Sequence, residues 1–167
     1  QLTAALLCAV ILSACGGAPA DADYTCTVSI SCATILDNMD QCAESKKELV
    51  PADGVILPAT EVAFAEGESA FDVLQRVCRD NGIHLESKFT PVYNSAYIQG
   101  IHNIYEFDVG KLSGWMYSVN GWFPNYGCSL YQVEDGDVIC WVYTCDLGAD
   151  VGGGQAAGDG QQEGANT

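Results

Sequence analysis

One segment of this chain has the period of an α-helix, whereas most of the rest alternates like β-strand. Residues 68–82 read ESAFDVLQRVCRDNG, with Ser69 as a good N-cap, Asp72 at the capping-box position and Gly82 as a stop signal. The apolar residues of one helical stripe are Phe71, Leu74, Val77 and Cys78. A single amphipathic helix needs an apolar surface to cover, so we expect it to lie across a β-sheet.

Strands are predicted on both sides of this helix. Residues 24–32 alternate with period two, which is typical of a half-buried strand. Residues 55–64 form two extended pieces interrupted by Pro58, and 37–43 favour a short helix. Residues 97–108 indicate a bent or paired strand around Gly100.

The second half adds a hairpin and a last strand. Residues 115–119 alternate and are followed by Asn120-Gly121, the strongest short hairpin signal. An acidic turn at 134–137 precedes the apolar strand 138–143. The predicted class is α+β, with one main helix packed on a mixed sheet of four to five strands.

The first fourteen residues indicate a secretory signal. QLTAALLCAVILSA is almost wholly apolar, too short to span a bilayer, and suited to the core of a signal peptide. Leu12-Ser13-Ala14-Cys15 resembles the cleavage box of bacterial lipoproteins, which makes Cys15 the lipid-modified first residue of the mature chain. An ordinary signal peptide with a chance cysteine is the alternative. With two or three acyl chains on Cys15, the protein would be anchored at the extracellular face of the cell membrane.

Four regions follow from these patterns. They are a lipoprotein signal peptide truncated at its start over 1–14, a polar tether over 15–23, a folded domain over 24–149 and a flexible tail rich in glycine and glutamine over 150–167.

Seven cysteines fall in the folded domain, which in an oxidising compartment predicts a disulfide-stapled fold. Their number is odd, so at most three bridges can form. Zinc is the alternative, but no CxxC pair occurs, and no metal is expected. The disulfide candidates are Cys26, Cys32, Cys42, Cys78, Cys128, Cys140 and Cys145.

Charge excludes one class of partner. The chain has 6 Lys and Arg against 22 Asp and Glu, for a formal net charge of −16. It has too few cations to neutralise a run of phosphates, so we expect no nucleic-acid binding. With 49 % apolar and 17 % charged residues, the composition is that of a globular protein.

Three runs occur in an order that identifies a family resemblance: GESAFDVLQ at 67–75, GWMYSVNGWFPNYG at 114–127 and EDGDVICWVYT at 134–144. They resemble the transcobalamin-like C-terminal domain family, a β-grasp-type domain of unknown function in Gram-positive surface lipoproteins. In cobalamin carriers of that family the domain is the smaller half of a clamp that closes on a corrinoid against a large helical barrel. The resemblance therefore implies a β-grasp-like fold and raises the expectation of cobalamin as a ligand, although this chain has no room for the barrel.

Aromatic side chains gather around the predicted hairpin. Alternate residues of the strand must pack on the helix, so some of these rings are core, whereas those at and after the turn could form an exposed platform for a ligand. The candidate ligand-binding residues are Trp115, Tyr117, Asn120, Trp122, Phe123 and Tyr126.

No nucleophile and base pair stands out, since His84 and His102 both fall in segments typical of exposed loop or strand. We therefore expect no enzyme, no catalytic residue and no cofactor. The predicted function is an extracytoplasmic, non-catalytic binding module for a corrinoid ligand or a surface protein partner. A structural or adhesion domain of the cell envelope is the alternative.

Overall fold

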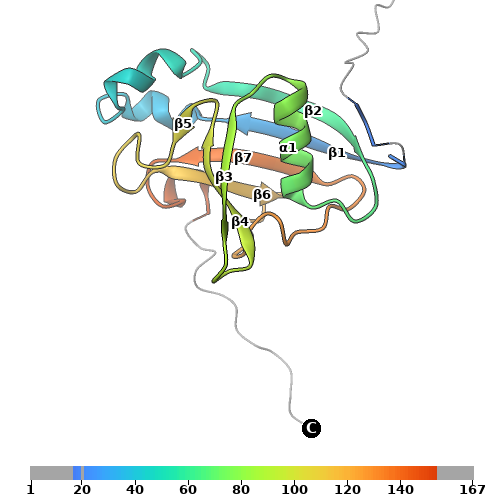
Figure 1. Cartoon of the computed structure of the whole chain (residues 1–167). Helices are drawn as coiled ribbons and strands as arrows, with labels where there is room; N and C mark the ends of the chain where they lie inside the picture. The colour runs from blue at the N-terminus through green and yellow to red at the C-terminus, as the bar shows by residue number, and fades with distance from the viewer. Residues whose placement is uncertain (1–16, 20, 154–167) are drawn as a thin grey trace, which may run out of the picture.

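The computed structural model describes residues 17–19 and 21–153 (Figure 1). The predicted signal at 1–14, the predicted lipidation site Cys15 and the predicted tail beyond 153 lie outside the described residues. The elements in order are β1 (Tyr24–Ser31), the 3₁₀ helices η1 (Ala33–Asn38) and η2 (Glu44–Leu49), β2 (Val55–Phe64), α1 (Ala70–Asp80), β3 (Leu85–Thr90), β4 (Ser95–Ile101), β5 (Ile104–Tyr105), β6 (Gly114–Val119), β7 (Val138–Thr144) and the 3₁₀ helix η3 (Ala149–Val151).

The main sheet has four strands in the order β2-β1-β7-β6. β1 pairs antiparallel with β2 and parallel with β7, and β7 pairs antiparallel with β6. The predicted strands at 24–32, 115–119 and 138–143 are therefore confirmed, and they form a mixed sheet. Val28 and Ile139 lie opposite each other at its centre, and both are fully buried.

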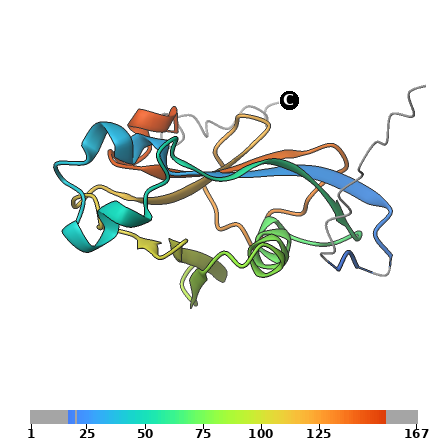
Figure 2. The ribbon, with the colours of Figure 1, turned by 90° about the horizontal axis from the view of Figure 1, so that it is seen from above.

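A second sheet of three strands, β3-β4-β5, lies on the same side of the main sheet as α1 (Figures 1 and 2). Of the bent or paired strand predicted over 97–108, the paired form is confirmed: β4 and β5 pair antiparallel and are joined by a tight turn in which His102 and Asn103 have φ of 55° and 60°. The prediction of a mixed sheet of four to five strands holds for the main sheet but missed this second sheet, because β3 has no apolar alternation that could reveal it and pairs only with β4.

Helix α1 begins and ends close to the predicted residues. Its capping box is present: the Asp72 N–H donates to Ser69 Oγ over 3.2 Å, and the Ser69 N–H donates to Asp72 Oδ2 over 2.9 Å. The predicted stripe is partly wrong, since Phe71 is only half-buried and Val73 is fully buried in its place. The helix contributes Ala70, Val73, Leu74, Val77 and Cys78 to the hydrophobic core that it shares with the main sheet.

Two local predictions are corrected. The short helix expected at 37–43 is absent, and two 3₁₀ helices, η1 and η2, flank that position instead. The two extended pieces around Pro58 form the single strand β2, because β2 lies at the edge of the sheet and Pro58 coincides with a shift in its register against β1.

The predicted disulfide staple is not supported. All seven cysteines from Cys26 to Cys145 are free thiols, and only Cys140 and Cys145 are partly exposed. Burial raises the pKa of the Cys78 and Cys128 thiols to about 12, so both stay protonated in the core. These cysteines act as small apolar core residues, a role that a cysteine count cannot separate from bridging.

The last described residues pack on the body although the sequence assigns them to the tail. Asp150 accepts a hydrogen bond from the Cys145 N–H over 2.7 Å and another from the Thr144 hydroxyl. Among the described residues, no helix has the length and apolarity needed to cross a bilayer.

Candidate functional site

A cavity of about 500 Å³ opens between β4, β6 and the loop at 124–128. Six of its lining residues are aromatic, and no lining residue carries a formal charge. The lining is Thr90, Tyr93, Ser95, Ala96, Tyr97, Ile98, Trp115, Met116, Tyr117, Pro124, Asn125, Tyr126, Gly127, Cys128 and Trp141.

Rings from the main sheet form one wall of this cavity. Trp115 and Tyr117 share the buried face of β6 because they are two residues apart on a strand. Tyr117 stacks on Trp141 of the neighbouring strand β7, with ring centroids 5.3 Å apart and an interplanar angle of 26°. Trp115 meets Tyr143 edge to face at 5.3 Å, so the wall is held by packing on both sides.

The polar ends of these two rings are already satisfied within the protein. The Trp115 Nε1–H donates to the Ile104 carbonyl over 2.8 Å, and the Tyr117 hydroxyl donates to the Tyr126 carbonyl over 3.0 Å. Burial raises the pKa of Tyr117, which keeps its phenol neutral. Trp115 and Tyr117 therefore offer ring carbons to a ligand, whereas the Nε1–H of Trp141 is buried without a hydrogen-bond partner among the described residues.

The opposite wall is β4 and the loop that docks on it. The Ala96 N–H donates to Ser129 Oγ over 2.9 Å, and the Cys128 thiol lies 3.8 Å from the Ala96 carbonyl. Gly127 permits this close approach, because a Cβ there would collide with the side chain of Ser95. These contacts fix the loop that carries Tyr126 at the mouth of the cavity.

Tyr97 lies on β4 and is 44 % exposed, although it also contributes to the lining. Its hydroxyl donates to Glu106 Oε2 over 2.6 Å. Burial and then this hydrogen bond to a carboxylate raise the pKa of Tyr97 to about 12. The phenol is thus neutral and bound to an anion.

The structure brings three of the predicted site residues to the cavity: Trp115, Tyr117 and Tyr126. Trp122 is 52 % exposed and does not line it, but its ring packs edge-on against Tyr126 at 6.1 Å. Phe123 is half-buried, and its ring lies beside Gly153.

Asn120 does not reach the cavity, because both ends of its side chain are bound within the protein. Its Nδ2 donates to Asp137 Oδ1 over 2.8 Å, and its Oδ1 accepts from the Val138 N–H over 2.9 Å. With φ of 52°, Asn120 forms the tight turn after β6 and ties it to β7.

The sequence reasoning missed three aromatic members of the lining. Tyr93 and Tyr97 belong to the β3–β4 hairpin, which was not predicted, and Trp141 was assigned only to an apolar strand. The alternation of Ile139, Trp141 and Tyr143 could have placed Trp141 on the buried face of its strand.

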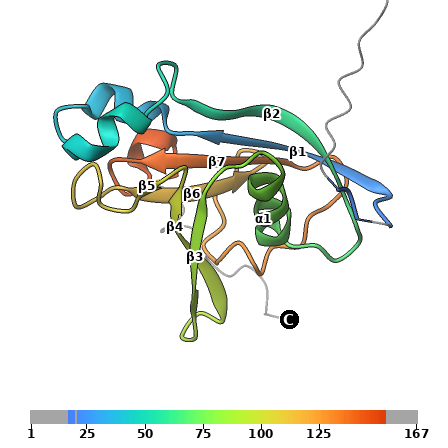
Figure 3. The ribbon, with the colours of Figure 1, turned by 45° about the horizontal axis from the view of Figure 1, so that its top comes forward.

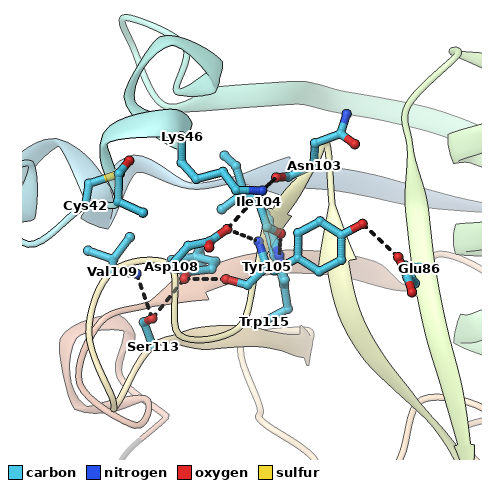
Figure 4. Close-up of polar contacts among 12 residues, drawn as sticks. Cys42, Lys46, Glu86, Asn103, Ile104, Tyr105, Asp108, Val109, Ser113 and Trp115 are labelled. Atoms are coloured by element: carbon cyan, nitrogen blue, oxygen red, sulfur yellow. Dashed lines mark hydrogen bonds and ion pairs between the residues drawn. The ribbon is translucent and has the colours of Figure 1, made fainter.

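A polar cluster surrounds Tyr105 of β5 (Figure 4). Lys46 Nζ donates to the Asn103 carbonyl over 2.6 Å, lies 3.4 Å from Asp108 Oδ2 and sits 4.7 Å from the centroid of the Tyr105 ring. The Tyr105 hydroxyl donates to Glu86 Oε2 over 2.7 Å. Within the described part of the chain, no group of three or more His, Cys, Asp or Glu residues could hold a metal ion.

Residues 67–145, a little under half of the chain, match the model of a family described as a domain of unknown function, DUF4430. That match spans α1, the whole second sheet, strands β6 and β7 of the main sheet and the loop at 124–128. No curated protein sequence matches the chain significantly.

The crystal structure of haptocorrin in complex with Cbi shares the fold, with a TM-score of 0.55 and 13 % identity. The match covers 74 % of this chain but only 25 % of haptocorrin, so the chain corresponds to a minor part of that protein. A protein from Ruminococcus gnavus ATCC 29149, provisionally described as metal binding, matches over 73 % of this chain and 97 % of its own length, with 16 % identity and a TM-score of 0.43.

Proposed function

We propose that this chain is a non-catalytic binding module whose ligand site is the aromatic cavity between β4, β6 and the loop at 124–128. The cavity itself is the observation that carries the proposal: it has about 500 Å³, it is open, and six aromatic residues line it. Ligand sites are concave, mostly apolar and of this size. A flat ring system fits the chemistry of such walls, because aromatic faces stack well on other rings.

A corrinoid is the candidate ligand. The likeness to haptocorrin, which was crystallised with Cbi, supports it, as does the order β2-β1-β7-β6, which is consistent with a β-grasp-like fold. The cavity would receive one edge of so large a molecule. The rest of the ligand would be covered by another chain or remain in water.

The module would work outside the cytoplasm, held to the extracellular face of the membrane by lipid on Cys15. The cleavage box in the sequence supports this location. Cys15→Ser should release the protein from the membrane fraction or block its processing. Unchanged partition into a detergent phase would contradict the lipid anchor.

Titration with cobinamide and cobalamin tests the ligand. We expect the visible absorbance of the corrinoid and the fluorescence of Trp115 and Trp141 to change together, since both indoles line the cavity. Tyr126→Ala should weaken this binding. Tyr24→Ala is a matched control, because Tyr24 is 37 % exposed against 40 % for Tyr126 and does not line the cavity.

Equal loss of binding in both variants, or no spectral change at all, would argue for the second candidate. That candidate is a structural or adhesion domain of the cell envelope with no small-molecule ligand. The β3–β4 hairpin, which projects from the rest of the fold (Figure 3), favours it. Phe89, Val92 and Tyr93 at its tip all expose large apolar side chains.

A further inference from the structure

Two tyrosines of the second sheet, β3-β4-β5, donate hydrogen bonds from their hydroxyls to glutamates. Tyr105, on β5, donates to Glu86 over 2.7 Å, and Tyr97, on β4, donates to Glu106 over 2.6 Å. A phenol that donates to a carboxylate carries extra electron density in its ring. Both rings therefore attract a positive charge that lies over the ring face.

The fold already uses one of these rings in this way. The ammonium of Lys46 lies 4.7 Å from the Tyr105 ring centroid, within the range of a cation–π interaction (Figure 4). Asp108 and the carbonyl of Asn103 hold the ammonium there. Tyr105 thus has both a carboxylate bound to its hydroxyl and a cation over its ring.

At Tyr97 the ring and the carboxylate are present, and among the described residues no cation lies over the ring. Lys88 is opposite Tyr97 in the register of β3 and β4, but it makes no cation–π contact with it. Tyr97 also belongs to the lining of the cavity, where no side chain is charged. The Trp115 and Tyr117 donors are engaged by protein carbonyls, so they offer a ligand no hydrogen bond.

We propose that the cavity accepts an organic cation, a quaternary or protonated amine, with its positive charge over the Tyr97 ring. The proposal rests on the proposed function, in which the cavity is the ligand site, and adds the charge of the ligand. Aromatic faces suit a quaternary ammonium group, which carries no N–H and therefore needs no hydrogen-bond acceptor in the cavity wall. The formal net charge of −16 favours cations at long range and opposes anions.

The test compares two molecules of the same shape and different charge. Choline carries a trimethylammonium group, and 3,3-dimethylbutan-1-ol carries a neutral tert-butyl group in its place. Both are titrated into the full chain while the indole N–H signals of Trp115 and Trp141 are followed by NMR. We expect choline to bind between about twofold and about thirtyfold more tightly, the range that a cation–π contact provides.

Variants of Tyr97 localise the effect. Tyr97→Leu should abolish the preference for choline, whereas Tyr97→Phe, which keeps the ring, should retain most of it. Glu106→Gln should reduce the preference, because the phenol then donates to a neutral amide. Tyr24→Leu is the matched control and should leave the preference unchanged, and thermal unfolding of each variant verifies that it is folded.

Equal binding of choline and its neutral isostere would overturn the cation assignment and leave the cavity as the ligand site. A preference that survives Tyr97→Leu would overturn it as well. If neither molecule perturbs the two indoles and cobinamide also fails to bind, both this inference and the proposed function are wrong.

Discussion

Tyr117 lies flat on Trp141 inside the core, and at the same time its hydroxyl reaches the Tyr126 carbonyl on the opposite side of the cavity. One side chain thus joins the main sheet to the loop that carries the exposed aromatic residues. The stability of the core and the shape of the cavity are coupled through this residue.

Tyr117→Phe tests this coupling. The variant keeps the stacked ring and loses one hydrogen bond, so the free energy of unfolding should fall by about 1 kcal/mol. The loop at 124–128 should become more mobile, and the affinity for any cavity ligand should fall. Urea denaturation and hydrogen exchange of the loop amides measure the two effects, with Tyr24→Phe as the control. A variant with a rigid loop and unchanged affinity would contradict the coupling.

The seven cysteines from Cys26 to Cys145 should differ in how fast they are alkylated. In the folded protein, Cys140 and Cys145 should be alkylated before the other five, because only these two are partly exposed. Burial raises the pKa of Cys26 and Cys32 to about 11, so these two thiols should react slowly at pH 8. Peptide-by-peptide mass spectrometry measures the order of labelling.

In denaturant without reductant, all seven should be alkylated. Fewer than seven labelled cysteines under that condition would mean that bridges form in the isolated protein, contrary to the structure.

The folded protein should lose stability at alkaline pH. Burial raises the pKa of Cys78 and Cys128 to about 12, from about 9 for an exposed thiol, and burial with Glu106 raises the pKa of Tyr97 to about 12 from about 10. In this range the unfolded chain releases protons that the folded chain keeps. Stability is therefore fully present below about pH 9 and is lost as pH rises toward about 12.

The urea midpoint between pH 8 and pH 11 measures this loss, and phenolate absorbance reports when the tyrosines ionise. A midpoint that stays constant to pH 11 would show that these groups are not shielded in the native state.

The sequence predicted α1 well because its signals are local. Ser69 and Asp72 are three residues apart and cap the helix with each other, without help from the rest of the fold. β3 could not be predicted, because Glu86 and Lys88 give it no buried face and only its pairing with β4 makes it a strand.

The candidate site was half predictable for the same reason. Trp115 and Tyr117 alternate on one strand, so a local pattern places them together. Trp141 reaches the cavity through the pairing of β7 with β6, and Tyr97 through the packing of β4 against β6, and no period within one segment shows either contact. The cysteines illustrate the same limit, since whether a thiol has a partner depends on the whole fold.

Replacing Trp115 and Trp122 by alanine should separate core from surface. Trp115 is 7 % exposed and donates to the Ile104 carbonyl, so Trp115→Ala should lower the free energy of unfolding by about 3–5 kcal/mol. Trp122 makes an edge contact with Tyr126 at the mouth of the cavity, so Trp122→Ala should cost no more than about 1.5 kcal/mol.

Binding distinguishes what the exposed ring does. Trp122 supports Tyr126, which lines the cavity, so Trp122→Ala should weaken ligand capture through a more mobile Tyr126, while Trp122→Phe keeps an aromatic edge and should retain capture. Circular dichroism follows unfolding in both variants, and ligand absorbance follows binding. If Trp122→Ala unfolds the protein as readily as Trp115→Ala, the ring belongs to the core. If stability and ligand binding both stay at their original values, Trp122 has no part in the site. The exposed aromatic residues after the hairpin turn would then not form a platform for the ligand.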